Sequence, residues 1–308
     1  MTHSVIRIGT RGSALALWQA EETKRQLELV HPELQFELEI IHTKGDKILD
    51  VPLAKIGDKG LFTKELEVAL LEGSIDMAVH SLKDLPTNLP KGMMLGAVMK
   101  RAEFRDAIVS SNGKTLATLD ATDVVATSSL RRKSQLLQRY PNLNIVDIRG
   151  NVNTRLKKME DGYCNVMVMA AAGLQRLGLD RYITEVLNER DFIPAVGQGA
   201  IAIEIRENDA RVTEIIAPIN DTQTRLAVSA ERAFLNKLEG GCQVPIGCFS
   251  EVDEGGTIML EAFIASVDGK RYFRKSVEGI HPQVVGISLA DYLFSVGGKD
   301  ILEELRTQ

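Results

Sequence analysis

The sequence predicts an α/β protein with a separate, smaller α+β domain at its C-terminal end. Segments with strand character alternate with helical segments as far as Met169, as in β-α-β units built around a parallel or mixed sheet. After Asp221 this alternation gives way to a long helical segment and a hairpin. The 308 residues are 44% hydrophobic and 26% charged, which is an ordinary globular composition. At ~150 residues per domain, the length suffices for about two domains.

Apolar periodicity and capping residues define the elements in the first part of the chain. The turn at 10–13 contains capping residues for a helix that is stopped by Pro32, and Gly73 ends the next helix. We expect strands at 5–8, 34–40 and 76–79, helices at 14–30 and 63–71, a loop at 42–60, and a polar turn at 80–84.

The same signals define the elements that follow. We expect strands at 124–126, 144–148 and 166–169, a helix at 130–139, and a second helix after a turn at 150–153. In the C-terminal domain we expect helices at 222–238 and 284–296, and a hairpin with strands at 258–267 and 272–277. Residues 194–199, which are Pro-Ala-Val-Gly-Gln-Gly, are interpreted as a crossing or hinge segment.

Composition excludes several classes of protein. The longest strongly apolar run, at 166–174, has nine residues and contains Gly173, whereas a membrane span needs ~20. The first residues have no apolar signal core. The three cysteines, Cys164, Cys242 and Cys248, form no Cys-x-x-Cys pair, and the histidines show no metal-ligand spacing. We therefore expect a cytoplasmic protein with no membrane partner, no disulfide framework and no metal site.

Positive charge is concentrated in one part of an acidic chain. The net charge is −5, but residues 127–158 contain eight basic side chains and one acid, a net charge of +7. The rest of the chain therefore carries −12. A basic region of this kind in an acidic protein indicates a local anion site rather than a general nucleic-acid surface. The low aromatic content of 5% also disfavours a nucleic-acid partner.

Polar clusters follow four of the predicted strands, at 10–13, 81–84, 127–129 and 149–151. The carboxyl ends of strands line the ligand crevice of α/β sheets, and helix starts at that edge bind anions. Arginine side chains add bidentate recognition of carboxylates. The chain has no phosphate-binding loop of the Gly-x-x-x-x-Gly-Lys-Ser/Thr type. The clusters therefore predict a cleft for a ligand with several carboxylates or phosphates, and they disfavour ATP.

Seven motifs together resemble one known family. They are IGTRGSALA at 8–16, KGLFTKE at 59–65, HSLKDLP at 80–86, TSSLRR at 127–132, IRGNVNTR at 148–155, PAVGQG at 194–199 and LEGGCQVPIG at 238–247. In this order they resemble the porphobilinogen deaminase, or hydroxymethylbilane synthase, family of tetrapyrrole (haem) biosynthesis. The resemblance spans nearly the whole chain and is weakest after Gly256. One departure is Phe104, where the family often has proline.

The resemblance implies a monomeric cytoplasmic transferase with two α/β lobes like those of periplasmic binding proteins. It implies a first lobe of 1–100 and 195–218, a second lobe of 101–194, and a C-terminal α+β domain of 219–308. It also implies a dipyrromethane cofactor attached through Cys242. Four porphobilinogen molecules would be condensed head to tail onto this cofactor with loss of ammonia, and hydrolysis would then release hydroxymethylbilane.

The resemblance also implies a role for individual residues. Asp84 would be catalytic, because a carboxylate can stabilise the cation that forms when ammonia leaves, and the adjacent Lys83 favours its charged form. The residues implied to bind the cofactor are Lys83, Ser81, Thr127, Ser128, Ser129, Arg131 and Arg132. Those implied to bind substrate are Arg11, Ser13, Arg149, Arg155, Arg176 and Gln198. A mobile lid would contain Lys55, Lys59 and Phe62.

Simpler interpretations stay open for several of these residues. Asp84 could instead be a helix N-cap, and the lid could be an ordinary surface loop. Cys164 and Cys248 are expected to be structural, and Lys133, Lys157 and Lys158 are expected to be solvated. The alternative function is that of a non-catalytic, two-lobed binding protein for a polycarboxylate ligand.

Overall fold

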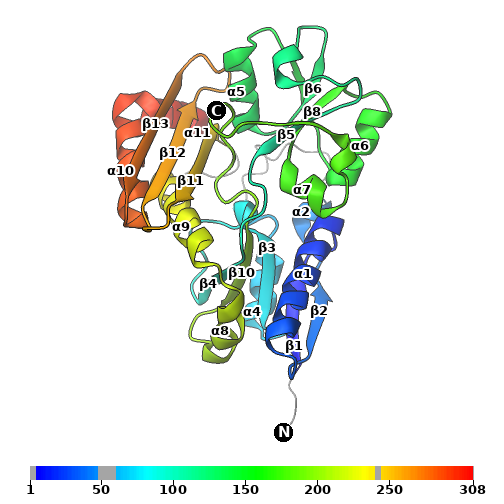
Figure 1. Ribbon diagram of the computed structural model, residues 1–308, viewed down its shortest axis with the longest axis vertical. Helices are drawn as coiled ribbons and strands as arrows, with labels where there is room; N and C mark the ends of the chain where they lie inside the picture. Colours follow the sequence, from blue (N-terminus) through cyan, green and yellow to red (C-terminus); the bar gives the residue numbers. More distant parts are fainter. Residues whose placement is uncertain (1–4, 48–59, 240–243, 308) are drawn as a thin grey trace. The chain divides into compact units, whose positions relative to one another are not determined.

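The computed structural model describes residues 5–47, 60–239 and 244–307. These residues form two five-stranded sheets and one three-stranded sheet, each flanked by helices (Figure 1). They group into two compact units, which we describe separately. The first unit holds the residues up to 102 together with 199–225, and the second holds 103–198 and the residues from 226 onward.

The sheet of the first unit is mixed, with the strand order β2-β1-β3-β10-β4. β1 is parallel to β2 and β3, whereas β10 is antiparallel to both β3 and β4. The strands are β1 (Ile6–Thr10), β2 (Phe36–Ile40), β3 (Met77–Ser81), β4 (Met93–Val98) and β10 (Ile201–Arg206). The helices of this unit are α1 (Ala14–Val30), α2 (Lys44–Lys47), α4 (Lys64–Leu71) and α8 (Ala210–Ile216), with the 3-10 turns η1 (Leu82–Asp84) and η4 (Ala217–Ile219).

Apolar residues bury both faces of this sheet. Met77 and Val79 belong to the core that includes residues of α1 and α8. Ala78 points to the opposite face and packs with Leu66 and Leu70 of α4, as the two-residue period of a strand requires. The carboxyl end of β3 is thus held between two covered faces.

The sheet of the second unit repeats this arrangement, with the order β7-β6-β8-β5-β9. β6 is parallel to β7 and β8, and β5 is antiparallel to β8 and β9. The strands are β5 (Asp106–Ser110), β6 (Val124–Ala126), β7 (Asn144–Val146), β8 (Val166–Ala170) and β9 (Ile183–Val186). The helices are α5 (Leu130–Arg139), α6 (Val152–Glu160) and α7 (Ala171–Arg176), with the 3-10 turns η2 (Leu116–Thr118) and η3 (Asp180–Tyr182).

The C-terminal part consists of an antiparallel sheet packed against helices. Its strands are β11 (Ile246–Val252), β12 (Ile258–Ala265) and β13 (Tyr272–Gly279), in that order. Its helices are α9 (Thr222–Lys237), α10 (Pro282–Leu293) and α11 (Lys299–Arg306), with the π-helical turn η5 (Phe294–Gly298) between the last two. The predicted hairpin turn packs on α5: a Cβ at Gly269 would lie 2.5 Å from the Ser134 carbonyl oxygen. Gly269 also has a φ of +72°, so two independent constraints favour glycine.

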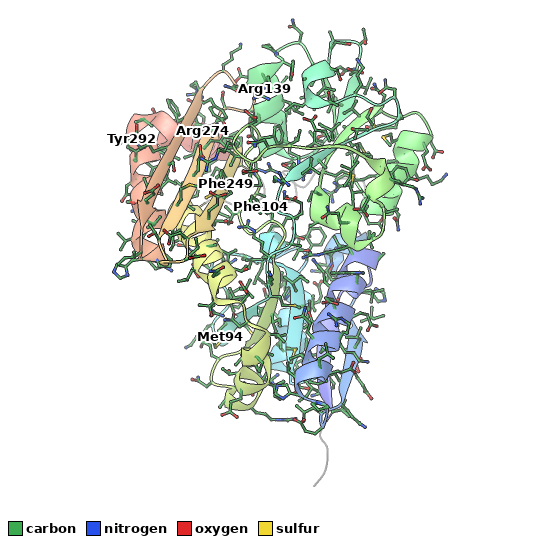
Figure 2. All side chains as sticks on the ribbon, viewed as in Figure 1. Met94, Phe104, Arg139, Phe249, Arg274 and Tyr292 are labelled. Carbon is green, nitrogen blue, oxygen red and sulfur yellow. The ribbon has the colours of Figure 1, made fainter. Side chains whose placement is uncertain are left out.

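Phe104, the departure from the family pattern, has a packing role. Its ring stacks on that of Phe249 in β11, with 6.2 Å between ring centroids and 15° between ring planes. Figure 2 labels both residues next to each other in the second unit. Phe104 thereby extends a small apolar cluster that includes Ile193 and Phe263.

The structure confirms the predicted fold class, with two mixed α/β lobes and a small C-terminal α+β part. The sequence interpretation missed β4, β5, β9, β10 and β11. It also ended β3 too early, because the strand continues through His80 to Ser81, and it placed α2 in a loop. The domain boundaries implied by the resemblance stay a prediction. In the part of the chain described here, no helix is both long and apolar enough to span a bilayer.

Candidate active site

A pocket opens in the first unit beside the carboxyl ends of β1 and β3 and the start of α1. It lies where the polar clusters at 10–13 and 81–84 follow their strands, as parallel strands in one sheet require. Five of the predicted site residues line it, together with Gln19, Thr63 and His80. Those five are Arg11, Ser13, Phe62, Ser81 and Asp84. The structure therefore brings the predicted catalytic carboxylate and two predicted substrate-binding residues together.

Asp84 is positioned by the backbone that follows β3. It is the last residue of η1, and the Leu85 N–H donates to the Leu82 carbonyl at 3.1 Å. The Leu82 N–H in turn donates to the Ala200 carbonyl at 3.0 Å. Asp84 is partly buried and caps no helix N-terminus. The N-cap alternative for Asp84 is therefore wrong, and its carboxylate faces a pocket instead. Its neighbour Lys83 is also partly buried.

One wall of the pocket carries the predicted substrate-binding residues. The Arg11 guanidinium lies 4.2 Å from the centroid of the Phe62 ring, a cation–π contact. Ser13 is the N-cap of α1 and accepts from the Ala16 N–H at 3.3 Å. The Ser13 hydroxyl therefore keeps its own proton for another acceptor.

The sequence interpretation missed Gln19, which is buried on α1 and lines the pocket. Its side-chain amide exchanges hydrogen bonds with the Ser81 hydroxyl, with Nε2 to Oγ at 2.9 Å and Oγ to Oε1 at 3.1 Å. A polar residue on the buried face of an otherwise apolar helix turn is the signal that could have identified it.

In the second unit, the predicted cofactor residues Thr127, Ser128 and Ser129 lie between β6 and the start of α5. Ser129 is the N-cap and accepts from the Arg132 N–H. Ser128 Oγ accepts from the Ile148 N–H and donates to the Ile148 carbonyl, both at 2.9 Å. The backbone bond from Thr127 N to the Val146 carbonyl, at 2.9 Å, adds to this connection. The two polar turns of this sheet edge are thus held together.

Arg131 and Arg132 are buried around a carboxylate that the sequence interpretation missed. Arg131 Nη1 lies 2.7 Å from Asp106 Oδ2, and Arg132 Nη2 donates to Asp106 Oδ1 at 2.7 Å. Gln198 Nε2 donates to the same oxygen at 2.9 Å. Arg131 Nη1 also donates to the Ile193 carbonyl, and Arg132 Nη1 to the Val168 carbonyl. Asp106 directly precedes the apolar run Ala-Ile-Val, a strand signal that could have placed it at this edge.

Asp106 is an ionised group within the protein. Burial opposes its ionisation, but the charges and hydrogen bonds of Arg131 and Arg132 outweigh burial and hold the pKa of Asp106 well below its usual range. Gln198, predicted to bind substrate, is buried in this network, and its contact with substrate stays a prediction. The two arginines thus have a structural role whether or not they also meet a ligand.

The remaining predicted arginines are less buried than this pair. Arg149, Arg155 and Arg176 are each half-buried, and Arg155 Nε donates to the Gly150 carbonyl at 2.7 Å. Burial lowers the pKa of Arg149, so a nearby anion would stabilise its charge. Lys157 is solvated, with 74% of its side chain exposed. Lys158 differs from the prediction, because it is half-buried and donates to the Arg149 carbonyl at 3.2 Å.

Three of the predicted residues, Lys55, Lys59 and Cys242, lie outside the described residues. The other two cysteines are buried: Cys164 in the core of the second lobe and Cys248 in the C-terminal core. Burial raises the pKa of Cys164 to about 11, which leaves very little thiolate near neutral pH. Both positions agree with the expected structural role.

Comparison with known proteins identifies the family. Residues 6–214 match the family "Porphobilinogen deaminase, dipyromethane cofactor binding domain", and residues 225–295 match "Porphobilinogen deaminase, C-terminal domain". The porphobilinogen deaminase of Desulfitobacterium hafniense is 52% identical over 302 residues, covering 98% of each chain. That of Syntrophobacter fumaroxidans is 48% identical over 307 residues, covering 99% of each.

Among solved structures, the effector-binding domain of BenM with benzoate is 17% identical and has a TM-score of 0.42. The match covers 70% of this chain and 91% of that one. The family matches cover most of the described sequence, and these two relatives match 98% and 99% of the chain. The chain therefore belongs to the porphobilinogen deaminase family.

Proposed function

We propose that this chain catalyses the stepwise condensation of four porphobilinogen molecules, with loss of ammonia, and the final hydrolysis that releases hydroxymethylbilane. The observation that carries the proposal is the first-lobe pocket, where Asp84 and Arg11 line one space. Porphobilinogen offers a match for both groups. Its acetate and propionate carboxylates suit a guanidinium, and its pyrrole becomes cationic when the amine leaves.

In this pocket the Asp84 carboxylate stabilises positive charge on the substrate and accepts a proton. Loss of ammonia breaks the C–N bond of porphobilinogen, the electron pair leaves with nitrogen, and a cationic pyrrole remains. The Asp84 carboxylate stabilises that cation and accepts a hydrogen bond from the pyrrole N–H. When a second pyrrole carbon attacks, one C–C bond forms, and the attacking carbon loses its proton to the Asp84 carboxylate, which passes it to solvent. Arg11 and Ser13 hold the substrate carboxylates during these steps.

The edge of the second lobe suits a dipyrromethane, which bears four carboxylates. The groups that can donate there are the Ser129 hydroxyl, the start of the ten-residue helix α5, and the guanidinium groups of Arg149 and Arg155. These side chains are partly exposed, and the burial of Arg149 favours an anionic partner. The Ser128 hydroxyl, which donates to the Ile148 carbonyl, would have to turn away from that carbonyl to donate to the cofactor. When bound, the cofactor supplies the pyrrole carbon to which the chain of substrates is added. The remaining proposed cofactor contacts are Lys83, Ser81, Thr127, Arg131 and Arg132. The remaining proposed substrate contacts are Arg176 and Gln198.

Cys242 is the proposed attachment point, through a thioether. A thiolate is a strong nucleophile toward an electron-poor carbon. The burial of Cys164 and Cys248 in apolar cores supports this choice, because neither thiol is accessible to a pyrrole. We further propose that the protein is a cytoplasmic monomer and that Lys55, Lys59 and Phe62 belong to a lid over the substrate.

Intact mass tests the proposal together with turnover. We expect the purified protein to exceed its sequence mass of 33.9 kDa by two deaminated porphobilinogen units, and to convert porphobilinogen to hydroxymethylbilane. Peptide mapping should place the adduct on the peptide containing Cys242. Cys242→Ala should lack both adduct and turnover, whereas the control Cys248→Ala should keep both. An active protein without an adduct, or an adduct on another cysteine, would contradict the proposed attachment. A protein that binds porphobilinogen without converting it would be the non-catalytic alternative.

A further inference from the structure

A buried polar cluster lies directly behind the Asp84 pocket. His80 Nε2 and Glu204 Oε2 form a hydrogen bond of 3.0 Å, and the two side chains are 3% and 0% exposed. His80 is on β3 and lines the pocket, whereas Glu204 is on the neighbouring antiparallel strand β10. Because His80 pairs with Ala202 and Glu204 pairs with Ala78, the two side chains lie diagonally on one face of the sheet.

Helix α4 covers this face and contributes a second buried acid. Burial raises the pKa of Glu67, and the charge of Glu204 adds to this effect while that of His80 opposes it. Among the described residues, Glu67 Oε1 and Glu204 Oε1 have no hydrogen-bond partner. On the same face, Ala78 of β3, together with Ile75 just before the strand, packs against apolar residues of α4. The polar groups thus lie next to an apolar cluster under the same helix.

Such a cluster is an unfavourable way to fill a core. A buried ion pair can often be replaced by apolar residues of similar size with no loss of stability, and unpaired buried polar atoms are destabilising. The neighbouring apolar packing shows that this face accommodates such residues. A role in stability alone therefore explains the His80–Glu204 pair poorly.

The pair does explain how the end of β3 is held. Three consecutive residues of this segment are fixed, each by a different contact. His80 is bonded to Glu204, Ser81 to Gln19 on α1, and the Leu82 N–H to the Ala200 carbonyl. Asp84 follows two residues later, at the end of η1. Any rotation of the strand end would move its carboxylate in the pocket.

We propose that His80, held by Glu204, is a positioning residue for Asp84 in the condensation reaction. The pair fixes the carboxyl end of β3 so that the Asp84 carboxylate keeps its place relative to the substrate cation. This inference rests on the proposed function of Asp84. Arg11 and Ser13, the proposed substrate-binding residues, are outside β3, on the segment between β1 and α1. Loss of the pair should therefore lower kcat and leave KM nearly unchanged.

The test compares the two ends of β3. At the pocket end, His80→Leu removes the donor, whereas His80→Gln keeps an N–H that can reach Glu204. At the other end, Asp76 accepts from the Arg7 backbone N–H at 2.8 Å and pairs with Arg206, so Asp76→Asn is the matched control. Each variant is studied as the full chain, with intact mass for the adduct, thermal unfolding for stability, and porphobilinogen kinetics.

We expect His80→Leu to lower kcat about ten- to a hundred-fold, the range that a displacement near 1 Å produces, with KM within about twofold. The adduct mass should be retained, and His80→Gln should restore a large part of kcat. Asp76→Asn should keep kcat within about twofold even if its Tm falls. Equal losses of kcat in Asp76→Asn and His80→Leu would overturn the proposal, as would an unchanged kcat in His80→Leu.

Glu204→Gln keeps the inference testable if His80→Leu does not fold, because the amide oxygen can still accept from Nε2–H while the charge is removed. We expect a loss of kcat smaller than that of His80→Leu. The double variant His80→Gln with Glu204→Gln should lose less than the product of the two single losses, because the residues act as a unit. Losses that multiply would overturn the proposal. Failure of the wild type to convert porphobilinogen would instead refute the proposed function.

Discussion

The two lobes place a buried acid on the same strand of the same sheet topology, but give it opposite partners. In each sheet the fourth strand in order, β10 or β5, is antiparallel to its neighbours. Glu204 on β10 and Asp106 on β5 are both 0% exposed. Glu204 bonds to His80 and lies near a second acid, Glu67. Asp106 is instead surrounded by two arginines and an amide.

This difference gives the two lobes different electrostatic environments. Among the described residues beside the Asp84 pocket, the two buried acids Glu67 and Glu204 lie near one histidine, His80, which suits a site that stabilises a cation. Among those at the corresponding edge of the second lobe, one buried acid, Asp106, contacts two arginines and an amide, which suits the binding of carboxylates. One strand topology thus supports two kinds of electrostatic environment, chosen by a few side chains.

The largest effect on stability is expected when one of the two arginines that contact Asp106 is removed. Arg132→Leu leaves Asp106 buried with half of its neutralising charge, so we expect it to lose about 3–5 kcal/mol of unfolding free energy, measured by urea denaturation. Intact mass should also show impaired cofactor assembly. Lys157→Leu is the control, since Lys157 is solvent-exposed, and it should change stability by less than about 0.5 kcal/mol.

Equal loss of cofactor in Arg131→Leu, Arg132→Leu and Lys157→Leu would show that the basic region acts as a diffuse field. The buried pairing of the arginines with Asp106, compared with the solvated Lys157, would then not explain cofactor binding.

The pH dependence of stability should have opposite signs in the two lobes. The lowered pKa of Asp106 contributes stability that is present above about pH 4, the usual pKa of Asp, and that is lost as pH falls toward the folded-state pKa. The raised pKa of Glu67 contributes stability that is present below its unfolded pKa, near 4.3, and lost as pH rises through the folded-state value.

Denaturation curves at several pH values measure both effects. Asp106→Asn should weaken the fall in stability on acidification below about pH 4. Glu67→Gln should be more favourable, relative to the wild type, at pH 7 than at pH 4. The comparison between the lobes would fail if the two variants changed the pH dependence in the same direction.

A smaller effect is expected from the packing of Phe62 in the first-lobe pocket. A Cβ at Gly45 would lie 2.3 Å from the Phe62 ring and 2.8 Å from the Leu61 carbonyl oxygen. Gly45→Ala should therefore shift Phe62 away from Arg11, destabilise the protein by about 1–3 kcal/mol and raise KM for porphobilinogen. Gly255→Ala, whose Cβ would meet only the Asp253 side chain, is the control. An unchanged KM in Gly45→Ala would show that the Arg11–Phe62 contact does not shape the substrate site.

Helix caps and turns were predicted well, because they depend on residues that are neighbours in the sequence. Helix α1 begins at Ala14 and ends at Val30 as expected, and Ser129 caps α5. The pocket residues Arg11, Ser13 and Asp84 come together because each follows a strand of the same parallel set.

Contacts that depend on a distant strand were not predicted. His80 was assigned to a turn, although it is the fourth consecutive buried residue of β3, after Met77, Ala78 and Val79. Its partner Glu204 is 124 residues away, on a strand that the sequence interpretation did not identify. Asp106 was missed for the same reason, since its arginine partners are contributed by α5. Antiparallel insertion of β5 and β10 cannot be derived from local periodicity alone.

The most direct test of catalysis in the first-lobe pocket is the turnover of Asp84→Asn with porphobilinogen, measured beside Asp147→Asn, an exposed acid in the second lobe. Asn keeps the shape of Asp84 but removes the charge that stabilises the substrate cation. We predict that Asp84→Asn folds with a Tm near that of the wild type, still binds porphobilinogen, and loses turnover by about 10²–10³-fold, whereas Asp147→Asn turns over normally. Turnover close to that of the wild type in Asp84→Asn would contradict the assignment of Asp84 as the catalytic carboxylate.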